Sequence, residues 1–377
     1  MSSEISPLDP AANPELKGHD QAIGTLEQAL ASGRLPHGWL FHGRRGIGKA
    51  TLAYRFARVL LAGDAGAARP RPGLDLESDH PVFAQVAGRH HPDLAVIEAE
   101  RDPKTGKIKP VIPVDRVRAA TARLHSTAAI SERRVLIVDG AELLNRNAAN
   151  ALLKPLEEPP AGAVLILVSH RPGRVAATLR SRCAKLAMHG LDEALLIDLL
   201  ARHAPDLAEA VRPPIIAMAR GSLGRALELA GGDWLNTYEK VVTTLAADPP
   251  DALALDELAS ALAKWSAKDG FPAVMDLIQT VFGRIAAHAT DRGGPPLFVG
   301  EESSLSRLAT RQGLDRWGGL WEKVGRLSAA VDGLNLDHAQ ALAQILSAMA
   351  KPPEAEAALP FVRATSSLGG ALLGESL

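Results

Sequence analysis

The first half of the chain alternates short apolar runs with stretches of helical periodicity. The apolar runs are rich in Val, Ile and Leu and predict buried strands over residues 38–42, 94–99, 135–138 and 164–168. Apolar residues recur at helical spacing over residues 51–60, 113–124 and 143–158. Pro155 lies inside the last segment, and because an interior proline removes a helical hydrogen bond, we expect a kink or an early end there. This alternation predicts an α/β domain built on a parallel sheet.

Residues 63–93 interrupt the alternation. They are rich in Gly, Pro, Ala, Asp and His and have no period, which predicts a long surface insertion. This segment contains His80, His90 and His91, but it has no Cys or carboxylate at the spacing of a metal site. We therefore expect surface histidines and no metal there.

From about Gly190 onward the strand pattern stops and only helical patterns remain. Three short helices are expected over residues 191–203, 213–219 and 223–230. Longer helices are expected over residues 253–267, 271–288, 314–331 and 337–350. The tail from Lys351 is rich in Ala, Pro, Gly and Ser, and we expect it to be loosely ordered. The second half is therefore predicted to be all-α.

Composition narrows the class of protein. A chain of 377 residues exceeds what one compact core holds, so two or three domains are expected. No apolar run reaches the roughly 18 residues that span a bilayer, and the polar segment 1–16 does not resemble a secretory signal. The single cysteine, Cys183, excludes a disulfide framework and a four-cysteine zinc site, so we expect a reducing, cytoplasmic location and no structural zinc. A net charge of −1 argues against strong binding of polyanions by the chain as a whole, but it is compatible with local basic patches.

A glycine-rich loop follows the first predicted strand. The segment Gly43-Arg44-Arg45-Gly46-Ile47-Gly48-Lys49-Ala50 fits the phosphate loop Gly-x-x-x-x-Gly-Lys-Ser/Thr except at its last position. There a methyl group replaces the hydroxyl that binds Mg²⁺. Gly43, Gly46 and Gly48 allow backbone N–H groups to face phosphate oxygens, and Lys49 supplies a positive charge for the β- and γ-phosphates. The context of strand, loop and helix predicts a nucleotide phosphate site.

The groups that would hydrolyse a bound nucleotide are incomplete. Thr51 follows the missing hydroxyl, but on a helix the next residue points about 100° away, so it is a poor magnesium ligand whose hydroxyl can still reach a phosphate. An apolar strand ends in Asp139, which can orient a metal through water, but Gly140 follows where phosphate-loop ATPases of this type carry a water-activating Glu. Arg44 and Arg45 either contact phosphate or are solvated at the loop tip. The sequence therefore predicts that this site binds ATP or ADP weakly or without hydrolysing it.

Three further segments carry a family resemblance: Leu152-Leu153-Lys154, Leu156-Glu157-Glu158-Pro159-Pro160 and Ser181-Arg182-Cys183. Together they resemble the signature of clamp loader subunits of the AAA+ superfamily. Combined with Asp139-Gly140 and Ala50, they resemble the delta-prime family of bacterial DNA polymerase III clamp loaders. The resemblance covers about residues 14–230 and extends more weakly to residues 334–337. The tau/gamma family is less similar, because it would carry Lys-Thr in the loop, Asp-Glu after the strand, and four zinc cysteines.

The resemblance implies roles for three more residues. Arg182 would be an arginine finger that reaches into the ATP site of a neighbouring subunit, and the alternative is a structural salt bridge at a domain edge. Ser169 stands where the family has its first sensor residue. Arg225 matches the second sensor, with an ordinary helix-surface arginine as the alternative. From the residue pattern alone, Glu157 and Glu158 are either a solvated helix end or a catalytic pair.

The resemblance also implies an organisation and a task. It implies an AAA+ P-loop domain over residues 1–188, a helical lid over 189–232, an all-α oligomerisation collar over 233–350, and a flexible tail over 351–377. The implied function is that of a DNA polymerase III clamp loader subunit, which takes part in ATP-driven loading of the sliding clamp onto primed DNA. Its partners would be tau/gamma and delta-like subunits in a heteropentamer, with no membrane partner. The subunit itself would have little or no ATPase or polymerase activity.

Two alternative hypotheses belong to other functional classes. The first is a working tau/gamma-like ATPase that hydrolyses ATP at its own site, and Ala50 and Gly140 argue against it. The second is an independent DNA-binding module, which the near-neutral net charge disfavours.

Overall fold

The computed structural model describes residues 9–63, 73–100, 111–125, 129–269, 271–334 and 337–350. These residues belong to two compact units. The first unit comprises the chain up to residue 208 together with residues 219–231, and the second comprises residues 209–218 and the chain from residue 232. The sequence pattern also predicts a turn at residues 102–106 and a short apolar strand over 108–112. The turn, residues 108–110 of that strand and the tail from Lys351 lie outside the described residues.

A parallel sheet forms the centre of the first unit. Within the described residues it has five strands in the order β2-β3-β4-β1-β5, and every pairing is parallel. The strands are β1 Gly38–His42, β2 Leu94–Ile97, β3 Arg134–Asp139, β4 Ala163–Ser169 and β5 Ala184–Ala187. The sequence pattern predicted the first four, and the α/β class is confirmed. The sequence pattern missed β5, because the four residues of this strand include Lys185 and have only one buried side chain.

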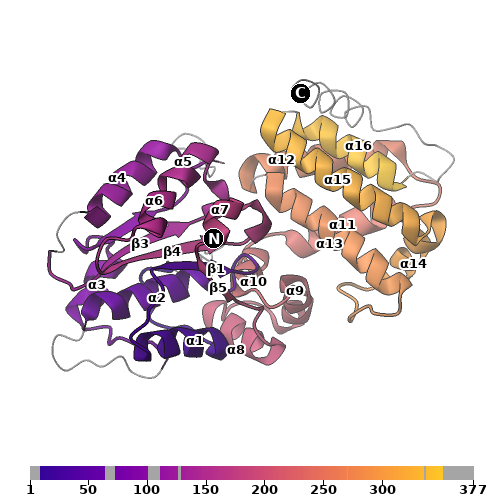
Figure 1. Cartoon of the computed structure of the whole chain (residues 1–377). Helices are drawn as coiled ribbons and strands as arrows, with labels where there is room; N and C mark the ends of the chain where they lie inside the picture. The colour runs from indigo at the N-terminus through magenta and orange to yellow at the C-terminus, as the bar shows by residue number, and fades with distance from the viewer. Residues whose placement is uncertain are drawn as a thin grey trace, which may run out of the picture. The chain divides into compact units, whose positions relative to one another are not determined.

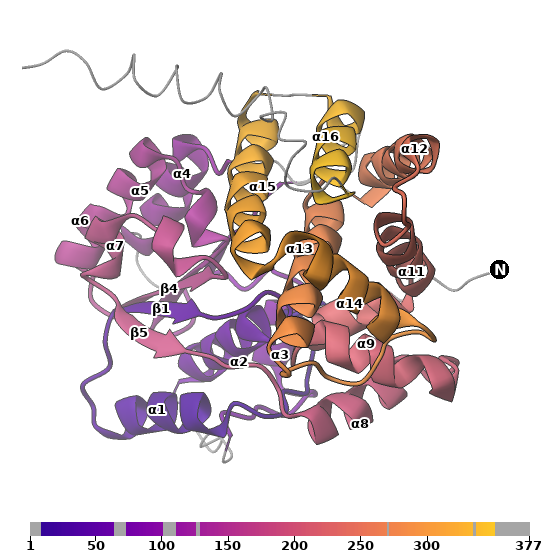
Figure 2. The same cartoon turned by 90° about the vertical axis from the view of Figure 1, so that its right-hand side faces the viewer.

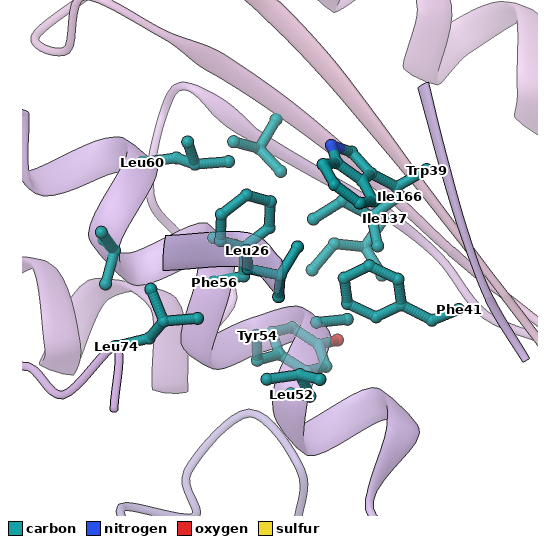
Figure 3. Close-up of a cluster of buried hydrophobic side chains, with 14 of the residues drawn as sticks. Leu26, Trp39, Phe41, Leu52, Tyr54, Phe56, Leu60, Leu74, Ile137 and Ile166 are labelled. Carbon is teal, nitrogen blue, oxygen red and sulfur yellow. The ribbon is translucent and has the colours of Figure 1, made fainter. Parts of the chain in front are cut away.

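Side chains on each strand alternate between two helical layers. On β3, Val135 and Ile137 belong to one core cluster, whereas Leu136 and Val138 belong to the other, because successive strand residues point to opposite faces. The first cluster, drawn in Figure 3, is covered by α1 Asp20–Ala31, α2 Lys49–Ala62 and α3 Pro81–Ala87. The second is covered by α4 Val114–His125, α5 Arg146–Ala151, α6 Leu153–Glu157 and α7 Ala177–Arg180. In Figure 1 these two groups of helices lie below and above the sheet.

The break expected near Pro155 is present. The predicted helix 143–158 is divided into the 3₁₀ turn Ala141–Leu143, α5 and α6, and the junction between α5 and α6 lies at Leu152. Because Pro155 has no N–H, the carbonyl of Ala151 cannot receive the usual helical bond, so α5 ends there. The proline itself sits in the first turn of α6, where the missing N–H costs little.

The prediction of a period-less surface insertion is wrong for residues 73–93. This segment contains α3, and Leu74, Phe83 and Val86 from it are buried in or against the core. His91 is also fully buried, contrary to the surface position expected for it, and its Nδ1 accepts a hydrogen bond from the N–H of Asp93 at 3.1 Å. A helix of seven residues makes only two turns, which is too short for a detectable period.

Two more helices, α8 Glu193–His203 and α10 Leu223–Ala230, belong to the first unit. Both match predicted helices, α8 beginning two residues later than expected. The turn Pro172–Arg174 connects β4 to α7.

The second unit contains only helices and turns among its described residues. After the 3₁₀ turn Glu209–Val211 and α9 Arg212–Ala219, its helices are α11 Trp234–Leu245, α12 Ala252–Asp269, α13 Phe271–Ala289, α14 Glu301–Gln312, α15 Leu314–Leu334 and α16 His338–Ala350. Helices α12 and α16 lie side by side (Figures 1 and 2). The fully buried carboxylate of Glu301 accepts bonds from Tyr238 Oη at 2.5 Å, Arg284 Nη2 at 2.7 Å and the Leu297 N–H at 2.6 Å. The sequence pattern missed α11 and α14.

Candidate functional site

The loop between β1 and α2 has the backbone that the glycine pattern predicted. The φ angles of Gly43, Gly46 and Gly48 are 154°, 74° and 99°, values that residues with a side chain rarely adopt. A Cβ atom at Gly43 would collide with the carbonyl oxygen of Met188. Helix α2 begins directly at Lys49. The expected succession of strand, glycine loop and helix is therefore present.

Lys49 is engaged with its own loop. Its side chain is buried, and Nζ donates a hydrogen bond to the carbonyl oxygen of Arg44. Burial lowers the pKa of Lys49 to about 8, although the nearby carboxylates of Asp139 and Glu142 oppose this change. Thr51 is likewise buried on the first turn of α2. The ammonium group that would bind phosphate thus has a backbone partner in this structure.

Carboxylates stand at the carboxyl edge of the sheet beside the loop. Burial raises the pKa of Asp139, at the end of β3, to about 6. Three residues later, Glu142 accepts a hydrogen bond from His170 Nδ1 at 2.8 Å, and its side chain is only 2% exposed. Burial alone would raise the pKa of Glu142, but hydrogen bonds from His170 and from Ser169 outweigh it and lower the pKa to about 2. Ser169, the predicted first sensor, is fully buried at the end of β4.

Sequence reasoning missed Glu142. The signal for it was a carboxylate three residues after Asp139, at the strand end where ligands of parallel sheets bind. Its Oε2 atom is buried and has no hydrogen-bond partner among the described residues. Across the part of the chain that the structure describes, no three His, Cys, Asp or Glu side chains come together as a metal-binding group.

The start of α10 is bonded to the glycine loop. The N–H of Gly224 donates to the carbonyl oxygen of Gly46 at 2.9 Å. The Ser222 hydroxyl donates to the carbonyl oxygen of Arg45 at 2.8 Å and accepts from the Arg225 N–H at 3.1 Å, which makes Ser222 the N-cap of α10. We call the Gly224–Gly46 and Ser222–Arg45 bonds the α10 clasp. The clasp fixes the loop tip against a segment almost 180 residues away in the sequence.

The arginines of the loop point to the same segment. Arg44 Nη1 donates to the carbonyl oxygen of Arg220 at 3.2 Å, and Arg45 Nη2 lies 3.4 Å from Glu228 Oε1. The predicted second sensor, Arg225, forms an ion pair with the same Glu228, at 3.5 Å. Each loop arginine therefore has a polar partner within its own chain. His19, which sequence reasoning also missed, bonds through Nε2 to the carbonyl oxygen of Ile47 at 2.6 Å.

Arg182 lies at the other end of β1 from the glycine loop. It lies two residues before β5, whose Ala184 is paired with Trp39 near the start of β1. Its carbonyl oxygen lies 3.3 Å from the position of a Cβ atom on Gly38, the first residue of β1. The loop begins after His42, four residue steps along the strand, which at ~3.3 Å per residue is about 13 Å. The structure therefore separates Arg182 from the other candidate site residues.

The Arg182 side chain is bonded within its own chain. Nη2 forms an ion pair with Glu157 Oε1 at 2.7 Å, and Nη1 donates to the carbonyl oxygen of Thr178 at 3.1 Å. The salt bridge considered from the sequence is thus present, and it joins Arg182 to Glu157 at the end of α6. The neighbouring Cys183 is buried, and burial raises the pKa of its thiol to about 11.

In the described part of the chain, no helix has the length and apolar character needed to cross a membrane.

Fold and loop together define the class of protein: a P-loop α/β protein whose second unit is helical in its described residues. Residues 18–192 match the family described as DNA polymerase III, delta subunit. The chain is 36% identical over 198 residues to the DNA polymerase III subunit delta' of Pseudomonas aeruginosa, covering 52% of this chain and 56% of that relative. It is 32% identical over 227 residues to the subunit delta' of Escherichia coli K12, covering 60% and 64%.

A relative of the other subunit type is matched less closely. The DNA polymerase III subunit gamma/tau of Mycobacterium tuberculosis H37Rv is 30% identical over 279 residues, which is 71% of this chain and 46% of that protein. The chain therefore spans less than two thirds of the length of these relatives. Residues 18–192 thus resemble the DNA polymerase III delta subunit family, and the predicted resemblance to delta-prime subunits is confirmed.

Solved structures add little to this assignment. A DNA polymerase III gamma subunit-related protein from Thermotoga maritima has a TM-score of 0.39 at 18% identity, covering 87% of this chain and 98% of its own. The RuvB Holliday junction branch migration motor from the same organism has a TM-score of 0.40 at 19% identity, covering 79% and 86%. Scores this low carry no argument, so the fold assignment depends on the sheet order and the glycine loop.

Proposed function

We propose that this protein is a delta-prime-type clamp loader subunit that takes part in the ATP-driven loading of a sliding clamp onto primed DNA. It would act in the cytoplasm in a heteropentamer with tau/gamma and delta-like subunits. Residues 1–188 would serve as the AAA+ domain, 189–232 as its lid and 233–350 as the oligomerisation collar. The family match over residues 18–192 and the delta-prime relatives support this proposal.

In this proposal the subunit's own site does not turn over ATP. Ala50 removes the magnesium ligand and Gly140 removes the water-activating carboxylate. Lys49 donates one hydrogen bond to the carbonyl oxygen of Arg44, so a bound nucleotide phosphate would share the ammonium group with the loop backbone. ATP or ADP would therefore be held weakly and would not be hydrolysed, with Thr51, Ser169 and Arg225 able to contact it.

Arg182 would act on a neighbouring subunit instead. The observation that carries this proposal is its position about 13 Å from its own glycine loop, at the opposite end of β1. An arginine that stabilises a transferring phosphoryl group must touch its oxygens, so from this position Arg182 can serve only a site on another molecule. Such a finger is worth about 10³ to 10⁵ in the rate at the site that it serves.

The rival hypothesis, an ATPase that works at its own site, makes the opposite prediction for the isolated chain. We expect the purified chain with Mg²⁺ and ATP to show no turnover above that of its Lys49→Ala variant. Mixing it with tau/gamma-type and delta-type subunits should yield a stable complex by size-exclusion chromatography, with turnover stimulated by the clamp and primed DNA. Brisk, Lys49-dependent turnover by the chain alone, or failure to enter a complex, would contradict the proposal.

A further inference from the structure

The Arg182 side chain is folded back along its own chain. Its Nη1 atom is bonded to the carbonyl oxygen of Thr178, four residues earlier in α7, and to Ser181 Oγ at 3.3 Å. Its Nη2 atom is bonded to Glu157 on α6, which neighbours α7 on the same face of the sheet (Figures 1 and 2). Both terminal nitrogens of the guanidinium are therefore occupied within the chain. A side chain held in this way does not extend toward a partner.

Among these contacts, the ion pair with Glu157 is the one that a phosphate would compete with directly. An arginine forms its strongest bonds with carboxylates and phosphates, and the same N–H groups serve both. At 2.7 Å the Glu157 carboxylate also cancels part of the positive charge that a transferring phosphoryl group requires. The Arg182 and Glu157 side chains are 39% and 49% exposed, so water and salt weaken their attraction. The pair can therefore be exchanged.

We propose that Glu157 parks the arginine finger: it holds Arg182 in an inactive, folded-back position, and engagement of a neighbour's nucleotide requires exchange of this carboxylate for the phosphate. The inference rests on the function proposed for Arg182 and adds a regulatory contact to it. Glu157 is not a catalytic residue in this account, because it touches neither nucleotide nor metal. It sets the fraction of time for which Arg182 is available.

The size of the effect follows from the exposure of the pair. An exposed ion pair contributes at most ~1 kcal/mol, which corresponds to a change of about fivefold in an equilibrium constant. Removing the parking contact should therefore raise the available fraction of Arg182 by between about twofold and fivefold. Since the finger acts in the transition state, this change should appear in kcat, with KM for ATP nearly unchanged.

The test uses the reconstituted clamp loader assembly with Glu157→Gln, which removes the charge and keeps the size of the side chain. Glu158→Gln is the matched control, because the adjacent Glu158 is also exposed and forms no ion pair with the described residues. Size-exclusion chromatography establishes that each variant assembles. We expect Glu157→Gln to raise kcat about twofold to fivefold and Glu158→Gln to leave it unchanged.

A double variant shows whether the effect passes through the finger. Arg182→Ala should abolish the turnover of the neighbouring site, and adding Glu157→Gln to it should restore nothing. If Arg182→Ala lowers turnover but Glu157→Gln leaves kcat unchanged or lowers it, the parking proposal is wrong while the finger stands. If Arg182→Ala leaves turnover intact, the finger itself is lost and the parking proposal falls with it.

Discussion

Replacing Gly224 with Ala perturbs the α10 clasp with a single methyl group. A Cβ atom on Gly224 would lie 2.8 Å from the Gly46 Cα and 3.3 Å from the Gly46 carbonyl oxygen. Carbon atoms pack comfortably at about 3.5–4.0 Å, so the start of α10 must move away from the glycine loop by roughly 1 Å. The two bonds of the clasp, now 2.9 Å and 2.8 Å long, would then exceed hydrogen-bonding distance.

The net free-energy change combines two opposing effects. Losing two hydrogen bonds costs about 2 kcal/mol at ~1 kcal/mol each. Alanine in a helix is more favourable than glycine by up to about 1 kcal/mol. The clasp should therefore open more easily by about 1 kcal/mol, equivalent to about a fivefold change in the opening equilibrium.

Native-state hydrogen exchange measures this opening directly, because each amide reports the free energy of its own local unfolding. In Gly224→Ala we expect the amides of Gly224 and Arg225, which donate the hydrogen bonds at the start of α10, to exchange about fivefold faster. Gly24→Ala is the matched control, since Gly24 lies inside α1 and a Cβ there meets no described atom within 4 Å. That control should slow exchange in α1. If Gly224→Ala also slows exchange in α10, the clasp does not restrain the loop and the reasoning fails.

Three further predictions concern buried groups. The pKa of Glu142 is lowered to about 2, so this carboxylate stabilises the fold by about 3 kcal/mol above pH 4.5, and the stabilisation is lost as the pH falls toward 2. In urea unfolding, Glu142→Gln should therefore weaken the loss of stability between pH 4.5 and pH 2. An unchanged loss in that range would contradict the assignment. Glu301→Gln should destabilise the second unit by about 3–5 kcal/mol in chemical denaturation, because the guanidinium of Arg284, only 14% exposed, loses its fully buried carboxylate partner. A change below about 1 kcal/mol would refute this. The buried thiol of Cys183, with its pKa raised to about 11, should react with a disulfide reagent at pH 8 only as fast as the protein opens, so rapid labelling of the native chain would show that it is accessible.

Local patterns predicted the parts of the fold that depend on neighbouring residues. The apolar runs identified β1, β2, β3 and β4, and the glycines identified a loop whose φ angles require them. Pro155 predicted a helix break because the cause, a missing N–H, is local. The pattern failed for β5 and α3, since four and seven residues are too few to establish a period.

Contacts between distant residues were not predictable in the same way. Nothing in the residues around Arg45 indicates that its carbonyl binds Ser222, because that contact depends on how α10 packs against the loop. The same holds for Glu142 and His170, which are brought together by the pairing of β3 with β4. For Arg182, the sequence left a finger and a salt bridge as alternatives. The structure contains the salt bridge, and the finger stays a proposal about another molecule's site.

The most direct test of the central claim compares two single variants in the reconstituted assembly. Arg182→Ala removes the group supplied to the neighbour, and Lys49→Ala removes the phosphate-binding charge of the subunit's own loop. With saturating ATP, Mg²⁺, clamp and primed DNA, we predict that Arg182→Ala lowers turnover at the neighbouring site by about 10³ or more, while Lys49→Ala leaves total turnover close to that of the unmodified assembly. The reverse pattern, normal turnover with Arg182→Ala and a collapse with Lys49→Ala, would contradict the account.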